Sequence, residues 1–214
     1  MSPRNARFDA VVFDNDGLLL ETEGAWTRAE KRLFARFGRE FTIEDKRAIL
    51  GKAGPLAEQA LAELLGRPDE GPELFRDLER LAFEEISRAA EPRPGAIELI
   101  ERLRLEGMPL GLASNSYRAF VDRALATAGV SKALFAVTIA GDEVADRKPA
   151  PDIYLAICEA LGCEPARTAV LEDSPTGVDA AVAAGCYVIG IPSVEGVVLD
   201  GAAVTVSSLA LAPL

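Results

Sequence analysis

Two aspartates, Asp14 and Asp16, close an apolar run that has the composition of a buried strand. In an extended chain, residues two apart point to the same side, so both carboxylates would face one small volume where the strand ends. Ligands bind at the carboxyl ends of strands in open α/β sheets. One acid can attack an electrophile while the other moves a proton, so the pair predicts a group-transfer enzyme that works with carboxylates.

Alternating strand and helix patterns would position these acids. The strands are expected at residues 8–13, 109–113, 137–140, 168–171 and 187–191, and the helices between them at 94–106, 117–128, 152–162 and 175–184. Alternation of this kind predicts right-handed βαβ units, and therefore an α/β fold with a doubly wound parallel sheet.

Residues 21–93 show a different sequence pattern: strand signals disappear and helix-forming residues dominate. Helices are expected there at 22–37, 43–50, 56–65 and 73–89. A stiff connector with two prolines, at 91–95, marks the return to the sheet. We therefore predict an inserted α-helical domain at 21–93 and a core domain made of residues 1–20 and 94–214.

The composition excludes several classes of function. The 214 residues carry a formal net charge of −11, which repels nucleic acid and anionic membranes, so neither is an expected partner. The chain contains no histidine, which excludes a Ser-His-Asp triad, a histidine nucleophile and histidine-ligated zinc. Acid–base work must fall to Asp, Glu, Lys or Tyr.

The terminal residues and the cysteines bear on the expected location and redox state of the protein. Residues 1–7 are polar, and no later run is long and apolar enough to cross a bilayer, so we expect a cytoplasmic protein. Cys158, Cys163 and Cys186 lack the paired spacing of a metal or redox motif, so reduced thiols are expected. We expect a monomer or a weak homodimer.

Four polar segments follow successive predicted strands. They are Asp-Asn-Asp-Gly at 14–17, Ser-Asn-Ser at 114–116, Arg-Lys-Pro at 147–149 and Glu-Asp-Ser-Pro-Thr-Gly at 172–177. In type and order they resemble the four motifs of the haloacid dehalogenase-like hydrolase superfamily, which has a Rossmann-like core and here a helical cap domain inserted after the first motif. The continuation Gly-Leu-Leu-Leu-Glu-Thr-Glu at 17–23 is similar to that of β-phosphoglucomutase and sugar-phosphate phosphatases.

The residue types at these positions suit phosphoryl transfer. Asp14 is the expected nucleophile, forming an aspartyl-phosphate, and Asp16 would protonate the leaving alcohol and then activate water. Lys148 supplies a compact cation for the phosphate and for Asp14. The Ser114 hydroxyl and the Asn115 N–H would bind phosphate oxygens near a helix amino terminus.

A cation is required because two carboxylates repel a phosphoryl group. Asp14, Glu172 and Asp173 are hard oxygen donors that suit octahedral Mg²⁺. The resemblance implies that the main-chain carbonyl of Asp16 adds a further ligand. The expected cofactor is therefore Mg²⁺ and the expected partner a small phosphorylated metabolite.

In the inserted domain, Trp26 and Lys52 are the candidate substrate-facing residues. The resemblance implies a histidine at position 26 and an arginine near 51–54 in the mutase, and this chain has neither. Trp26 also fits the apolar stripe of its own helix. We predict a phosphatase of small metabolites, with sugar phosphates as the leading class. A β-phosphoglucomutase-type isomerase and a catalytically silent binding protein stay open as alternatives.

Overall fold

The computed structural model describes residues 8–214. What was expected of residues 1–7 lies outside this range. The strands are β1 (Ala10–Asp14), β2 (Leu110–Ser114), β3 (Val137–Ala140), β4 (Thr168–Glu172), β5 (Tyr187–Gly190) and β6 (Val204–Thr205). The α-helices are α1 (Glu23–Arg36), α2 (Ile43–Ile49), α3 (Gly54–Leu65), α4 (Gly71–Ile86), α5 (Ala96–Leu105), α6 (Arg118–Thr127), α7 (Asp152–Leu161) and α8 (Pro175–Ala183).

The strands form one parallel sheet in the order β3-β2-β1-β4-β5-β6. The chain winds from β1 through β2 to β3 on one side and continues from β4 to β6 on the other. The winding direction therefore reverses between β1 and β4, and ligands bind at such a switch point. The predicted doubly wound α/β fold is confirmed.

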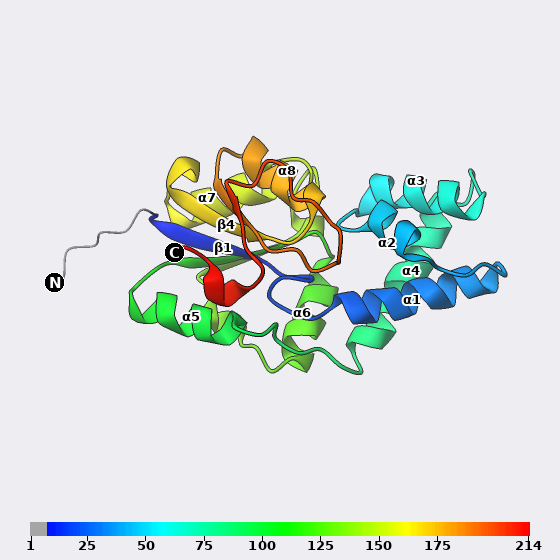
Figure 1. Cartoon of the computed structure of the whole chain (residues 1–214), viewed down its shortest axis with the longest axis horizontal. Coiled ribbons are helices and arrows are strands. Elements are labelled where there is room, and N and C mark those ends of the chain that lie inside the picture. Colours follow the sequence, from blue (N-terminus) through cyan, green and yellow to red (C-terminus); the bar gives the residue numbers. More distant parts are fainter. Residues whose placement is uncertain (1–7) are drawn as a thin grey trace.

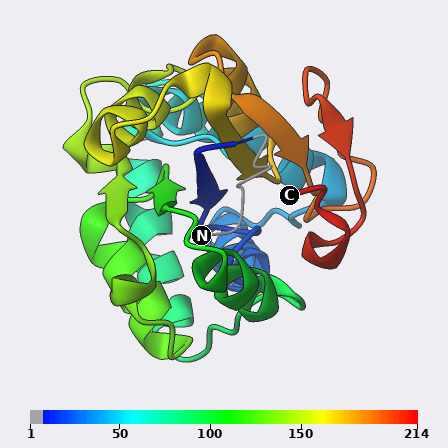
Figure 2. The same cartoon turned by 90° about the vertical axis from the view of Figure 1, so that its left-hand side faces the viewer.

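Alternate residues of each strand face opposite layers of helices. Val11 and Phe13 of β1 belong to an apolar cluster that includes residues of α5 and α6, whereas Val12 packs with Ile153 of α7 and Val178 of α8. Figure 2 shows the sheet between these two layers. Burial on both faces explains why β1 reads as a nearly unbroken apolar run.

Helices α1 to α4 gather at one end of the molecule (Figure 1). All four helices expected within residues 21–93 are present. Helix α2 begins at a capping box, in which the Thr42 side chain accepts a hydrogen bond from the N–H of Asp45 while the Asp45 carboxylate accepts one from the N–H of Thr42. Helix α4 packs against α1 and α3, so these helices share an apolar interior.

The two connectors between the helices and the sheet pair with each other. The N–H of Glu21 donates to the carbonyl of Glu91 at 2.8 Å, and the N–H of Arg93 donates to the carbonyl of Leu19 at 2.9 Å. The predicted division into a core and a cap domain at 20/21 and 93/94 stays a prediction, and we keep the name cap for residues 21–93.

Two strands, β1 and β6, differ from expectation by more than one residue. β1 runs over Ala10–Asp14, so it starts two residues late and includes the first aspartate. β6 was not predicted, because its two residues are too few to give a periodic signal. Among the described residues, no helix has both the length and the apolar character needed to cross a membrane.

Candidate active site

Lys148 joins the ends of two neighbouring strands. Asp14 is the last residue of β1 and Glu172 the last of β4. The Lys148 ammonium lies 2.6 Å from Asp14 Oδ1 and 2.6 Å from Glu172 Oε1, and all three side chains are buried. Burial lowers the pKa of Lys148, but the two carboxylates raise it well above its ordinary value, so the side chain stays an ammonium.

Two serines orient Asp16. The hydroxyls of Ser114 and Ser116 lie 2.7 Å and 3.0 Å from Asp16 Oδ2, to which both donate, while Asp16 Oδ1 has no hydrogen-bond partner among the described residues. Burial raises the pKa of Asp16, and the hydrogen bonds from Ser114 and Ser116 only partly oppose this. An oriented carboxyl with a raised pKa takes up a proton more readily, which suits a general acid.

Glu172 is fixed by donors on both of its oxygens. The Tyr154 hydroxyl donates to Oε1, and the N–H of Asp173 donates to Oε2 at 3.1 Å. A Cβ at Gly177, in the first turn of α8, would come within 2.0 Å of the Glu172 carboxyl carbon, so only glycine leaves room for this carboxylate. Tyr154 was not predicted, because a tyrosine in the apolar stripe of a helix reads as core.

Asp14, Glu172 and Asp173 form a candidate cation site. One oxygen of each lies within 4.8 Å of the others, and all three residues are buried. Burial raises the pKa of Asp14 and of Asp173 well above the ordinary value, and neighbouring carboxylates add to the rise, so a divalent cation would relieve this concentration of negative charge. Asp173 Oδ2 has no hydrogen-bond partner among the described residues, so it is open to a ligand. These residues fit a divalent metal.

The predicted metal role of Asp16 is limited by its surroundings. Oδ2 of its carboxylate is taken up by the hydroxyls of Ser114 and Ser116, and the expected contact with a cation is through its main-chain carbonyl. That contact, and Mg²⁺ as the metal, stay predictions.

Asn115 has a role that the sequence did not reveal. Its Oδ1 accepts a hydrogen bond from the N–H of Lys148 at 2.9 Å, and its Nδ2 donates to the carbonyls of Lys148 at 3.2 Å and Gly51 at 3.0 Å. The side chain therefore orders the Lys148 loop and ties it to the cap. Phosphate binding by Asn115 and Ser114 stays a prediction.

Arg93 holds the turn after the two aspartates. Gly17 has φ 80°, and a Cβ there would come within 2.2 Å of Asp173 Oδ2, so the turn requires glycine. Arg93 Nη1 donates to the Gly17 carbonyl at 2.6 Å, and Nη2 donates to the Pro192 carbonyl at 3.2 Å. This arginine, also missed from the sequence, fixes the turn against the loop after β5.

A pocket lies between the sheet and the cap. Asp14, Asp16, Lys148 and Asp173 line it from the sheet side, and its cap wall includes Glu23, Trp26, Glu30, Lys46, Lys52, Phe75 and Leu78. The Trp26 ring lies 5.1 Å, centroid to centroid, from Phe120 of α6. Trp26 therefore both lines the pocket and packs against the core, and the exposed Lys52 stands at its edge. Their contact with substrate stays a prediction.

Comparison with known proteins agrees with this geometry. Residues 8–185 match the family described as haloacid dehalogenase-like hydrolase. CbbY of Rhodobacter capsulatus is 37% identical over 196 residues, which cover 86% of this chain and 85% of that protein. The bifunctional riboflavin kinase/FMN phosphatase of Arabidopsis thaliana is 33% identical over 183 residues. That match covers 86% of this chain, which spans only 48% of the longer relative.

A solved structure shares the whole architecture. CbbY from Rhodobacter sphaeroides, in complex with phosphate, gives a TM-score of 0.79 at 28% identity, with 95% of this chain and 96% of that chain covered. The resemblance predicted from the four motifs is confirmed: the chain belongs to the haloacid dehalogenase-like hydrolases.

Proposed function

We propose that the protein is a Mg²⁺-dependent phosphatase that hydrolyses phosphate monoesters of small metabolites, with sugar phosphates as the leading class. The observation that carries this proposal is the meeting of Asp14, Asp16 and Lys148 at the floor of one pocket. One relative is named as an FMN phosphatase and another was solved with phosphate bound, which supports phosphate chemistry at this site.

The first step transfers the phosphoryl group to Asp14. A carboxylate oxygen of Asp14 forms a bond to phosphorus as the bond to the leaving oxygen breaks, and Asp16 gives its proton to that oxygen. Lys148, 2.6 Å from Asp14, offsets negative charge on the phosphoryl oxygens. A divalent cation held by Asp14, Glu172 and Asp173 would supply further charge neutralisation.

The second step releases phosphate. Asp16, now ionised, takes a proton from a water molecule, whose oxygen attacks phosphorus and breaks the bond to Asp14. Free phosphate leaves and Asp14 regains its carboxylate. The cap side chains in the pocket wall would select the leaving group and limit access of bulk water to the first step.

The test compares Asp14→Asn with the wild type in release of phosphate from 4-nitrophenyl phosphate, with and without Mg²⁺. Asp122→Asn is the matched control, because Asp122 lies on α6 in exposed ion pairs with Arg118 and Lys132, outside the pocket. We expect no turnover in Asp14→Asn, an unchanged circular dichroism spectrum, and full activity in the control. Substantial turnover by Asp14→Asn would exclude the aspartyl-phosphate mechanism.

This assay and one further measurement separate the alternatives. A silent binding protein would give no Mg²⁺-dependent release in the wild type. A mutase would convert β-glucose 1-phosphate, primed with the 1,6-bisphosphate, to glucose 6-phosphate with little free phosphate. We expect free phosphate, because residue 26 is tryptophan and the chain has no histidine to take part in a mutase cycle.

A further inference from the structure

Three charged side chains of α1 and α2 form a buried ion cluster in the pocket wall. Lys46 Nζ lies 2.6 Å from Glu23 Oε2 and 3.1 Å from both carboxylate oxygens of Glu30. The exposed fractions of the Lys46, Glu30 and Glu23 side chains are 6%, 4% and 17%. All three line the same pocket as Asp14 and Asp16. We call them the cap ion cluster.

A buried ion cluster is weak evidence for a stabilising role. Apolar residues of similar volume replace buried ion pairs at little or no cost in stability. Burial raises the pKa of Glu30 to about 7 in spite of the attraction of Lys46, so this carboxylate is held in an unfavourable place. A charged cluster that is buried at this cost and lines the pocket is a candidate for recognition of a ligand.

The cluster offers acceptors and no spare cation. Lys46 is shared between Glu23 and Glu30, so its ammonium is already paired with carboxylate oxygens. A hydroxyl group entering here can donate a hydrogen bond to a carboxylate oxygen, which is stronger than a bond between neutral groups. A phosphate or carboxylate would meet further acceptor oxygens and no unpaired cation of the cluster, in a poorly solvated site.

An apolar surface lies in the same pocket. Its members are apolar side chains of the cap helices, namely Trp26, Ile49, Ala57, Leu61, Phe75 and Leu78. Aromatic and aliphatic side chains take up the apolar face of a ring, while acceptors bind its hydroxyl edge. The two surfaces together match a ring that carries hydroxyl groups.

We propose, on the basis of the phosphatase function above, that Glu23, Lys46 and Glu30 form the leaving-group subsite. It accepts hydrogen bonds from the hydroxyls of an uncharged, hydroxyl-bearing ring and disfavours a leaving group with a second phosphate or a carboxylate.

Two other cations of the pocket, Arg147 and Lys52, could select the leaving group in place of the cap ion cluster. Arg147 Nη1 donates to the carbonyl of Asn115 at 3.4 Å, and Lys52 is exposed at the rim. If these cations, and not the cap ion cluster, selected the leaving group, a second anionic group would improve the substrate. The two possibilities therefore predict opposite preferences.

The first experiment uses the wild type with Mg²⁺. It compares kcat/KM for glucose 6-phosphate and a nucleoside 5′-monophosphate with kcat/KM for glucose 1,6-bisphosphate, and 4-nitrophenyl phosphate serves as a leaving group without hydroxyls. We expect the uncharged hydroxylated rings to exceed the bisphosphate by about tenfold or more, which corresponds to the loss of one good interaction. A bisphosphate that is the better substrate would overturn the proposal.

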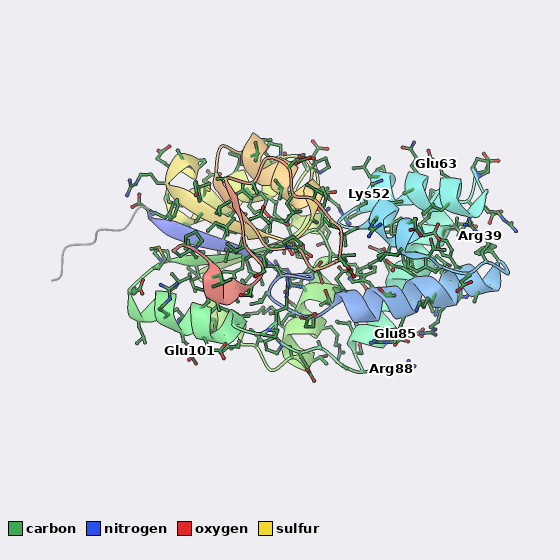
Figure 3. All side chains as sticks on the ribbon, viewed as in Figure 1. Arg39, Lys52, Glu63, Glu85, Arg88 and Glu101 are labelled. Carbon is green, nitrogen blue, oxygen red and sulfur yellow. The ribbon has the colours of Figure 1, made fainter. Side chains whose placement is uncertain are left out.

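The second experiment uses Glu30→Gln, with Glu85→Gln as the matched control. Glu85 is also a buried cap carboxylate, paired with Arg28 and Arg32, but it does not line the pocket. Figure 3 places Glu85 along the lower edge of the cap and Lys52 along its upper edge. Glu30→Gln should raise KM for the sugar phosphate about tenfold and change 4-nitrophenyl phosphate turnover less than about twofold. Glu85→Gln should leave the ratio of the two substrates unchanged.

An equal loss with both substrates in Glu30→Gln would show a structural role only and overturn the proposal. If Glu30→Gln does not fold, Glu23→Gln replaces it with the same expected ratio, and the wild-type preferences decide independently. Hydrolysis of 4-nitrophenyl phosphate without the ring preference refutes only the subsite. Absence of turnover with every compound refutes the phosphatase function itself.

Discussion

The Ser114 hydroxyl donates a 2.7 Å hydrogen bond to Oδ2 of Asp16, so the end of β2 orients an acid that follows β1. The two strands are neighbours, with Asp14 paired to Ala113 in the register. This bond and the one from Ser116 both end on Oδ2, so Oδ1 of Asp16, a residue that lines the pocket, has no hydrogen-bond partner among the described residues. The geometry favours a division of labour in which Asp14 attacks and Asp16 moves protons.

Asp16→Asn should separate the two chemical steps. Nitrophenolate leaves without a proton, so the variant should still phosphorylate Asp14 but fail to activate water. We expect a burst of about one nitrophenolate per enzyme, followed by a steady rate reduced by roughly 10²- to 10⁴-fold. Stopped-flow absorbance measures the burst and intact mass spectrometry detects the phospho-enzyme. Unchanged steady turnover would remove Asp16 from the mechanism.

The convergence of the motifs was predictable because it follows from topology. Asp14, Asp16 and Asp173 stand at or just beyond the ends of β1 and β4, and neighbouring parallel strands end at the same edge of the sheet. Lys148 was predictable only through its Lys-Pro context and the resemblance to a known family.

Other residues of the site gave no sequence signal. Glu30 and Lys46 have the spacing of polar positions on amphipathic helices, which are usually solvated, and they become buried only because α1 and α2 pack with these faces inward. Arg93 is far in sequence from the Gly17 turn that it holds. Such contacts depend on the three-dimensional path of the chain, which single-sequence patterns do not encode.

Lys148→Ala should reduce kcat by roughly 10²- to 10³-fold, as expected when one charge-stabilising donor is removed. Lys148→Arg should restore only part of the rate, because a planar guanidinium does not fit the 2.6 Å contacts with Asp14 and Glu172. Lys132→Ala, which removes an exposed lysine paired with Asp122, is the control and should retain full activity. Steady-state kinetics decide the matter, and an unchanged kcat in Lys148→Ala contradicts the assigned role.

Removal of divalent cations should abolish activity, and Mg²⁺ should restore it. Because a cation that binds only the folded state stabilises it, Mg²⁺ should also raise the melting temperature of the chelator-treated protein. Asp173→Asn should weaken both effects, since it removes one charged ligand of the buried carboxylate group. Calorimetry and phosphate release test this directly. Restoration by Zn²⁺ but not by Mg²⁺ would contradict a site built from hard oxygen donors.

Gly177→Ala should destabilise the protein, because the new Cβ would lie 2.0 Å from the Glu172 carboxyl carbon, and the buried carboxylate has little room to move. We expect a loss of about 1–3 kcal/mol in the free energy of unfolding, typical of overpacking. Gly24→Ala is the control: its nearest contact would be the Arg28 guanidinium at 3.4 Å, and alanine favours the helix. Urea denaturation compares them, and equal stabilities would contradict the close approach.

Glu30 should make the stability depend on pH in a specific direction. Burial raises its pKa from 4.5 to about 7, so between these values the folded protein holds a proton that the unfolded chain has lost. The free energy of unfolding contributed by this group therefore falls as the pH rises through that window, and the full penalty is present above it. Glu30→Gln has no such proton and should gain stability relative to the wild type between about pH 5 and pH 8.

Glu85→Gln is the control, and its free energy of unfolding should depend on pH in the opposite direction. Hydrogen bonds from Arg28 and Arg32 lower the pKa of Glu85, so its stabilisation is present above the ordinary carboxyl range and is lost as the pH falls through the lowered pKa. Glu85→Gln should therefore lose stability relative to the wild type near neutral pH and approach it in acid. Urea denaturation of the three proteins at matched pH values measures both differences. The stability difference between Glu30→Gln and the wild type could instead stay constant with pH or follow the Glu85→Gln trend. Either result would show that the pKa of Glu30 is not raised in the folded protein and that burial of this carboxylate does not destabilise the cap.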